Sequence, residues 1–228
     1  MSGSPVIAID GPGGAGKGTV SRRLASQLGW NLLDSGALYR LVALAGQRAG
    51  LAADDVSGHA RVARSLQVRF GQDEGGREQV WLDGREVTAE LRLEATGAAA
   101  SRVAAWPDVR SAILEMQRHF ARAPGLVADG RDMGTVVFPK ADLKVFLTAS
   151  PDERARRRHK QLKEKGLSAN LAALSREIAE RDLRDATRAV APMVAADDAV
   201  VVDTTDLGID EVVSRLLAMI RERCPGPR

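Results

Sequence analysis

A glycine-rich segment near the N-terminus constrains this chain more than any other feature. Its residues are Gly11, Pro12, Gly13, Gly14, Ala15, Gly16, Lys17, Gly18 and Thr19. It follows the apolar run Val6–Ile9, which is typical of a buried strand, and leads into Gly18–Leu28, which has the apolar spacing of a helix. Glycines let backbone N–H groups turn toward an anion, the helix N-terminus adds positive potential, and Lys17 adds a mobile charge. The segment therefore predicts a phosphate-binding loop, called the P-loop below.

The same residues are compatible with two other classes of nucleotide-binding protein, a dinucleotide-dependent oxidoreductase and a GTPase switch. Gly11–Gly16 also fits the spacing G-x-G-x-x-G, and Asp34 lies 18 residues beyond Gly16, near the place of the ribose-binding acid of dinucleotide-dependent oxidoreductases. Against this, Asp10 separates the strand from the first glycine, and Lys17 would add an unneeded charge beside the pyrophosphate. A GTPase switch is disfavoured because the chain has no Asn-Lys-x-Asp motif.

The P-loop departs from the strict pattern at the position after its lysine. That position usually holds a Ser or Thr that binds Mg²⁺, but here it is Gly18, and the hydroxyl comes one residue later at Thr19. We expect Mg²⁺ to be held mainly by nucleotide phosphates and water, with Thr19 contacting phosphate. No residue is assigned as a metal ligand, because Cys224 is the only cysteine and the three histidines stand far apart.

The rest of the chain predicts an α/β fold. Leu32–Leu33, Leu126–Ala128, Leu143–Leu147 and Val200–Val202 have the character of buried strands of a parallel sheet. Helical patterns separate them, and we expect these over residues 36–48, 89–105, 108–122, 152–165, 171–184 and 210–223. This alternation predicts a doubly wound parallel sheet with the P-loop at its edge and helices on both faces.

Between Leu66 and Thr88 the alternation of buried strands and helices is interrupted by a different sequence pattern. Apolar and polar residues alternate there, with turns expected at Asp73–Gly76 and at Asp83-Gly84. We expect a small antiparallel β subdomain, inserted at about residues 61–105 into a single P-loop domain that covers residues 1–228.

Charged residues follow two of the predicted strands and fill two of the helices. Asp34–Arg40 and Ala128–Thr135 come after strands, and the carboxyl ends of parallel strands share one edge, so both should face the P-loop. Burial of Asp129 would be costly without a function. Arg181, Asp185 and Arg188 fall within roughly 60° on one helix face, which is also compatible with a solvated, charge-paired surface.

An arginine run indicates a mobile segment. Arg154, Arg156, Arg157 and Arg158 follow Glu153 with no further acid to offset them. So much like charge on one helix repels itself unless an anion binds, and we expect a helical lid at about residues 152–168 that closes on a triphosphate.

The arginines also bear on the reaction. Phosphoryl transfer to a hydroxyl group needs a catalytic base, for which Asp34 would serve in a small-alcohol kinase of the shikimate kinase type. A phosphate acceptor needs no base, but two anions must be held together against their repulsion. The arginines favour a nucleoside monophosphate kinase. A non-catalytic nucleotide-binding switch remains an alternative from a different class.

Composition limits the partners. A net charge of +3 is small, and the aromatic residues are only four Phe, three Trp and one Tyr, so we expect no nucleic acid polymer as partner. No stretch approaches the roughly 20 apolar residues that span a bilayer, and we expect a cytoplasmic protein without a membrane partner.

Four motifs together resemble bacterial cytidylate kinases. They are Ile9–Thr19, Leu33–Arg40, Ala128–Thr135 and Arg181–Arg188. The similarity runs from about Pro5 to Ile220 and includes the inserted sheet. The resemblance implies transfer of the γ-phosphoryl group of ATP to CMP or dCMP, giving CDP or dCDP, with Mg²⁺, by a monomer.

The resemblance also implies roles for individual residues. Ser101, Arg110 and Asp132 would bind the cytosine edge, Arg181 and Asp185 the pentose, and Ser35, Arg40, Arg131 and Arg188 would surround the acceptor phosphate. Asp129, which follows a predicted strand, is a further candidate for binding the substrate. Lys17, Arg131, Arg157, Arg158 and Arg188 would be the catalytic set, with Arg157 and Arg158 in the lid. Ser101 and Arg110 rest on the resemblance alone, since no pattern of their own marks them.

Overall fold

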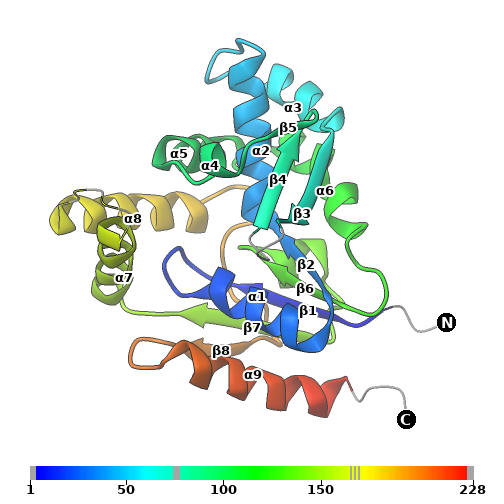
Figure 1. The fold of residues 1–228 in the computed structure, drawn as a ribbon, viewed down its shortest axis with the longest axis vertical. Helices are drawn as coiled ribbons and strands as arrows, with labels where there is room; N and C mark the ends of the chain where they lie inside the picture. Colours follow the sequence, from blue (N-terminus) through cyan, green and yellow to red (C-terminus); the bar gives the residue numbers. More distant parts are fainter. Residues whose placement is uncertain (1–3, 74–77, 165, 167, 169, 225–228) are drawn as a thin grey trace. The chain divides into compact units, whose positions relative to one another are not determined.

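The computed structural model describes residues 4–73, 78–164, 166, 168 and 170–224. The described residues fall into two compact units, which are treated separately below (Figure 1). The first unit consists of residues 1–34 and 117–228, and the second consists of residues 35–116. Within the described ranges, no helix has the length and apolar character needed to cross a membrane.

The first unit is built on a parallel sheet. Its strands in the described part of the chain are β1 (Val6–Asp10), β2 (Asn31–Asp34), β6 (Leu126–Asp129), β7 (Leu143–Thr148) and β8 (Val200–Asp203), in the order β2-β6-β1-β7-β8. The chain passes from β1 to β2 in one direction, and later from β6 across β1 to β7 and β8 in the other. This reversal confirms the predicted doubly wound parallel sheet.

The alternation of side chains along β1 decides what each sheet face carries. Ile7 and Ile9 point into a buried core that they share with α1 (Lys17–Leu28) and α9 (Ile209–Arg223). Asp10 points to the opposite face, where the short π-helix η1 (Met133–Val137) contacts β1. Helical segments therefore cover both faces, as predicted.

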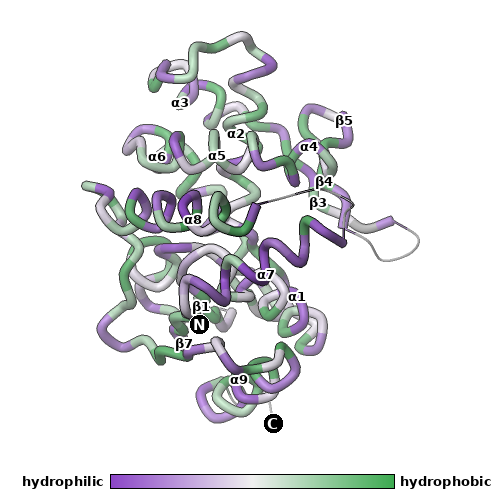
Figure 2. Tube along the Cα trace, turned by 90° about the vertical axis from the view of Figure 1, so that its left-hand side faces the viewer, coloured by the Kyte–Doolittle hydropathy of each residue, from purple (hydrophilic) through white to green (hydrophobic). Residues whose placement is uncertain are grey.

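The helices α7 (Pro151–Glu164) and α8 (Leu171–Ala186) pack against each other in the first unit. Figure 2 shows α7 mostly in hydrophilic colours, in keeping with its run of charged residues. Both helices lie where helical patterns were predicted.

Strand β8 differs from its prediction. We expected a buried strand, but β8 lies at the edge of the sheet, and in the described part of the chain it pairs only with β7. Val201 is 57% exposed, whereas Val202 is buried in the core. An apolar run alone does not distinguish an edge strand from a central one.

The second unit contains helices and a small antiparallel sheet. Its described elements are α2 (Ser35–Arg48), α3 (Val56–Arg64), β3 (Val68–Gln72), β4 (Glu78–Leu82), β5 (Arg85–Glu86), α4 (Thr88–Leu91), α5 (Glu94–Val103) and most of α6 (Pro107–Arg118). The order β3-β4-β5 confirms the predicted antiparallel sheet. Asp83 and Gly84 both have positive φ, at 51° and 77°, as a two-residue hairpin turn requires. The other predicted turn, Asp73–Gly76, lies outside the described residues from Glu74 onward.

Two helix predictions are corrected in this region, and one helix was not predicted. The helix expected over 89–105 is divided into α4 and α5, because Leu93 is extended and the Thr96 hydroxyl donates to the carbonyl oxygen of Glu90. Helix α6 ends at Arg118 instead of Arg122, and Pro124 disfavours helical backbone just beyond. Helix α3 was not predicted, although Asp55 caps it by accepting the N–H of Gly58 at 2.8 Å.

The shared core predicts a contrast between two leucines of the first unit. Leu216 on α9 is fully buried, and we expect Leu216→Ala to lower the free energy of unfolding by about 2–5 kcal/mol, because it leaves a cavity. Leu183 on α8 is 65% exposed, and Leu183→Ala should change it by less than about 0.5 kcal/mol. Urea unfolding of both variants measures the difference, and equal losses would contradict this description of the core.

Candidate active site

The P-loop leaves β1 through a backbone that only glycine can adopt. Gly11 has φ 137°, and a Cβ there would collide with the carbonyl oxygen of Leu147 on β7. Gly16, at φ 89°, is the N-cap residue of α1, which starts at Lys17. Because glycine has no side chain, the first N–H groups of α1 have no side-chain cap from it. The predicted arrangement of strand, loop and helix is confirmed.

Lys17 is buried at the start of α1. Its Nζ donates to the carbonyl oxygen of Pro12 at 2.9 Å, and its side chain is surrounded by charged groups of other segments. Burial, followed by the nearby Arg131 guanidinium, lowers the pKa of Lys17 to about 7, while Asp129 and Asp10 act in the opposite direction. Lys17 is therefore a cation whose charge depends on its partners.

Asp129 lies beside the P-loop, as predicted. It ends β6 and is buried, and its Oδ2 lies 3.3 Å from the position that a Cβ would take at Gly18. Burial raises the pKa of Asp129, Lys17 opposes that rise, and the carboxylate of Asp34 adds to it. Asp34 and Asp129 are register partners at the ends of β2 and β6.

Arg131 extends from the turn after β6 toward the P-loop. Its Nη2 lies 3.6 Å from the Cβ position at Gly13, and its Nε donates to Oδ2 of Asp185 at 3.1 Å. Asp185 is 4% exposed, so this ion pair is largely shielded from water. The pair joins the P-loop region to α8 and orients the guanidinium.

Two arginines of α7 also contact the P-loop region. Arg154 is buried, and it donates to the carbonyl oxygens of Ala149 and Gly13 at 3.0 and 3.2 Å and to Asp182 of α8. Arg157 has its Nη1 4.0 Å from the Cβ position at Gly16. Sequence reasoning did not select Arg154, because the run in which it lies gives no sign of which member points inward.

The sequence places no acid after Glu153 in this run, but the structure brings a further one from α8, where Asp182 pairs with Arg154. Arg157 donates to Glu153 at 3.0 Å and to both the hydroxyl and the carbonyl oxygen of Thr204, and Arg156 pairs with Glu153 at 3.1 Å. Glu153 and Asp182 therefore neutralise part of the positive charge of the arginine run. Arg158 donates to Gln161 at 3.3 Å on the surface of α7.

The predicted face of Arg181, Asp185 and Arg188 is only partly helical. Helix α8 ends at Ala186, and the Thr187 hydroxyl donates to the carbonyl oxygen of Leu183 at 2.7 Å there. Arg188 is thus positioned by the following turn, where its Nη2 donates to Ala191 at 2.7 Å. Arg181 contributes to the electrostatics of Lys17, so this end of α8 faces the P-loop.

Asp10 was not selected from the sequence as a site residue. It is 5% exposed, and its Oδ1 and Oδ2 accept the N–H groups of Met133 and Gly134 at 2.7 and 2.8 Å. Burial raises the pKa of Asp10 to about 6, although the two N–H groups lower it. Its position next to a glycine-rich loop was the only available signal, and the partners 123 and 124 residues away could not be inferred.

Four of the predicted residues belong to the second unit. Ser35 and Arg40 lie on α2, Ser101 on α5 and Arg110 on α6, and Ser35, Ser101 and Arg110 are buried. Arg40 donates to the carbonyl oxygen of Leu91, and its guanidinium lies 3.4 Å from the Cβ position at Gly97 of α5. Arg110 donates to Ala104 at 3.2 Å and lies 5.6 Å from the centre of the Tyr39 ring. Arg40 and Arg110 are thus held by contacts within this unit.

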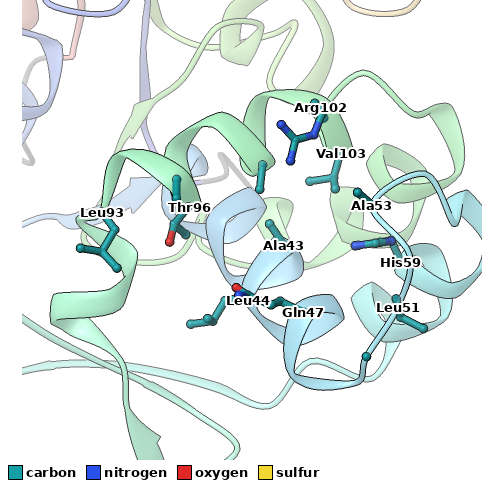
Figure 3. Close-up of a pocket in the computed structure, with 13 residues that line it drawn as sticks. Ala43, Leu44, Gln47, Leu51, Ala53, His59, Leu93, Thr96, Arg102 and Val103 are labelled. Carbon is teal, nitrogen blue, oxygen red and sulfur yellow. The ribbon is translucent and has the colours of Figure 1, made fainter.

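A separate cavity of about 460 Å³ lies between α2, α3 and α5 of the second unit (Figure 3). None of the predicted site residues lines it. Its buried histidine, His59, has Nδ1 2.8 Å from the carbonyl oxygen of Asp55 and packs edge-on against Trp106. This histidine therefore has an ordinary role in the core of the unit.

The lowered pKa of Lys17 predicts a pH-dependent stability. Because the unfolded chain holds the Lys17 proton up to about pH 10.5 and the folded chain only to about pH 7, wild-type stability should rise with pH across this window. Lys17→Met removes that dependence. We expect the unfolding free energy of wild type minus that of Lys17→Met to increase from about pH 7 to about pH 10 in urea titrations. The exposed Lys160→Met is the control, and a constant difference for Lys17→Met would contradict the pKa shift.

The family model for cytidylate kinase matches residues 7–222. A cytidylate kinase of Nitrosococcus oceani is 56% identical over 214 residues, covering 93% of this chain and 94% of its own. One of Shewanella loihica is 52% identical over 222 residues, covering 97% and 96%.

A solved structure of an uncharacterized protein from Eubacterium ventriosum is similar in fold alone, with a TM-score of 0.51 and 12% identity over 96% of this chain and 99% of that one. The sequence relatives carry the assignment further than the fold does. Family and relatives both extend over nearly the whole sequence, including the P-loop and the segment after β6. The chain belongs to the cytidylate kinase family.

Proposed function

We propose that this chain transfers the γ-phosphoryl group of ATP to CMP, giving ADP and CDP. The observation that carries the proposal is the collection of cations at the P-loop, where Arg131, Arg154 and Arg157 lie around the glycines and Lys17 is buried among them. Transfer between two phosphate groups requires mainly positioning and neutralisation of charge. A site built of fixed cations meets both requirements.

ATP is the donor in this proposal, and its phosphates bind the P-loop. Lys17 would stay close to the transferred phosphoryl group, and phosphate anions would raise its pKa because they favour the charged form against burial and the nearby Arg131. Mg²⁺ would supply charge neutralisation on the phosphate oxygens when bound. Gly18 stands where a Ser or Thr would bind the metal, so the donors proposed for Mg²⁺ are phosphate oxygens and water, with Thr19 touching phosphate.

CMP, and dCMP beside it, is the acceptor. In the first unit we assign Asp132 to the cytosine edge, Arg181 and Asp185 to the pentose, and Arg131 and Arg188 to the phosphate, with Asp129 as a further residue of the substrate site. In the second unit we assign Ser101 and Arg110 to the cytosine and Ser35 and Arg40 to the phosphate. Cytosine offers an amino donor beside ring acceptors, so an aspartate and an arginine suit it. These roles rest on the resemblance to the family.

The proposal extends to the organisation of the chain. Within one P-loop kinase domain, residues at about 61–105 form the subdomain that binds the acceptor nucleotide. Residues at about 152–168 form the lid, and Arg157 and Arg158 are its catalytic arginines. The contacts of Arg157 with Glu153 and Thr204 support the role of Arg157, because they hold its guanidinium beside Gly16 of the P-loop. We propose that the enzyme works as a cytoplasmic monomer on free nucleotides.

A coupled assay tests the reaction. We expect ADP to form rapidly from ATP plus CMP, and slowly from ATP alone. A nucleotide-binding switch, the alternative from another class, would hydrolyse ATP at a rate independent of CMP.

Lys17→Met should retain the fold and lose at least about a hundredfold in kcat, because the transferred group loses a cation in a site shielded from water. A kcat near that of wild type would exclude this role for Lys17.

The assignment of Asp132 predicts a change in specificity. Asp132 is 2% exposed, and Asp132→Ala should reduce kcat/KM for CMP more than for UMP, narrowing the preference by about 1–3 kcal/mol, because one buried hydrogen bond is lost. Uracil lacks the amino donor, so it gains nothing from the carboxylate. Steady-state kinetics with both acceptors provides the measurement. Equal losses with CMP and UMP would show that Asp132 does not bind the base.

A further inference from the structure

The end of β1 is joined to the turn after β6 by hydrogen bonds on both sides of two site residues. The carbonyl oxygen of Ile9 accepts the N–H of Gly130 at 3.0 Å. Asp10, the next residue, accepts the N–H groups of Met133 and Gly134 at 2.7 and 2.8 Å. Arg131 and Asp132 are the residues between these attachment points.

Helix η1 depends on Asp10 for its cap. Asp132 is the N-cap residue of η1, and an aspartate there commonly accepts an N–H of its own helix. The Asp132 side chain makes no such cap bond, and Asp10 from β1 accepts the first N–H groups of η1 instead. The direction in which Asp132 leaves the backbone is therefore set by another strand.

We propose that Asp10 is a positioning residue for the acceptor nucleotide, because its carboxylate fixes the backbone of Gly130–Gly134 and thereby the placement of Arg131 and Asp132. The inference rests on the proposed function, in which Arg131 and Asp132 bind CMP. In this role Asp10 acts through the turn and not by contact with the substrate, while its charge also favours the protonated form of Lys17.

The chemistry of the side chain favours this role over simple filling of space. Asp10 is almost fully buried, and a buried carboxylate is costly unless both of its oxygens are hydrogen-bonded. The amide of an asparagine has the same shape, but it replaces one of the two accepting oxygens by an NH2 group that can only donate, so one of the two N–H groups would face a donor. Arg131 has a second restraint in Asp185, whereas the η1 cap comes from Asp10. Loss of the carboxylate should therefore affect Asp132 most.

Asp10→Asn tests the proposal, with Asp142→Asn as the matched control. Asp142 accepts the N–H of Val6 at 2.8 Å, so both variants remove a carboxylate that binds backbone N–H, one beside the site and one at the other end of β1. We expect Asp10→Asn to raise KM for CMP roughly tenfold and to reduce the CMP-to-UMP preference, because a charge-assisted hydrogen bond is lost. KM for ATP should change less than about threefold, and the control should match wild type.

Two results would overturn the inference. One is a folded Asp10→Asn with wild-type KM for CMP and wild-type preference. The other is an equal rise in KM for ATP and CMP, which would assign Asp10 to the P-loop alone. If wild type does not phosphorylate CMP, the proposed function itself fails, so the two failures are distinguishable.

Amide hydrogen exchange in the wild-type protein decides the case if Asp10→Asn does not fold. The N–H groups of Met133 and Gly134 should exchange slowly without ligand, and CMP should slow them further while ADP does not. Exchange as fast as in an unstructured peptide, or no response to CMP, would exclude the role proposed for Asp10.

Discussion

The burial of Lys17 at the carboxyl edge of the parallel sheet is the constraint around which the first unit is arranged. A buried ammonium group is costly, and Asp129 and Asp10 offset part of that cost from β6 and β1. The pKa of Lys17 nevertheless falls, because burial and the neighbouring Arg131 outweigh the acids. The acids of the protein thus offset only part of the cost of burying this cation. An anion of high charge density completes its surroundings, which is what a nucleotide triphosphate supplies.

The arginines near the P-loop are held in place by protein groups. Arg131 binds Asp185, and Arg154 binds Asp182 together with backbone oxygens of the loop and of residue 149. The contacts of Arg154 with backbone carbonyl oxygens cost little to exchange for phosphate oxygens, which pair with a guanidinium more strongly than a carbonyl does. They also spare the ligand the entropy of ordering long side chains. Preorganised cations of this kind stabilise charge that develops during transfer without first having to reorient.

The sequence predicted those parts of the site that local patterns determine. The P-loop follows from glycine spacing between a strand and a helix, and Asp129 follows from its place after an apolar run, since parallel strands end at one edge. Arg154 could not be separated from Arg156 by pattern, because which arginine is buried depends on how α7 packs on α8. Arg188 was assigned to a helix face, but α8 ends two residues earlier. Ser101 and Arg110 have no local signature at all.

Asp10 shows how closely the fold and the site depend on the same few residues. Along β1 the side chains alternate, so Ile7 and Ile9 enter the core with α1 and α9 while Asp10 meets η1 on the other face. A shift of one residue in the register of β1 would place the carboxylate in the apolar core and an isoleucine against the N–H groups of η1. Gly11 limits such a shift from the next position, because its backbone lies against Leu147 of β7 with no room for a Cβ. The short sequence Ile9-Asp10-Gly11 thus specifies the strand register, the exit into the P-loop and the cap of the turn that carries Arg131 and Asp132.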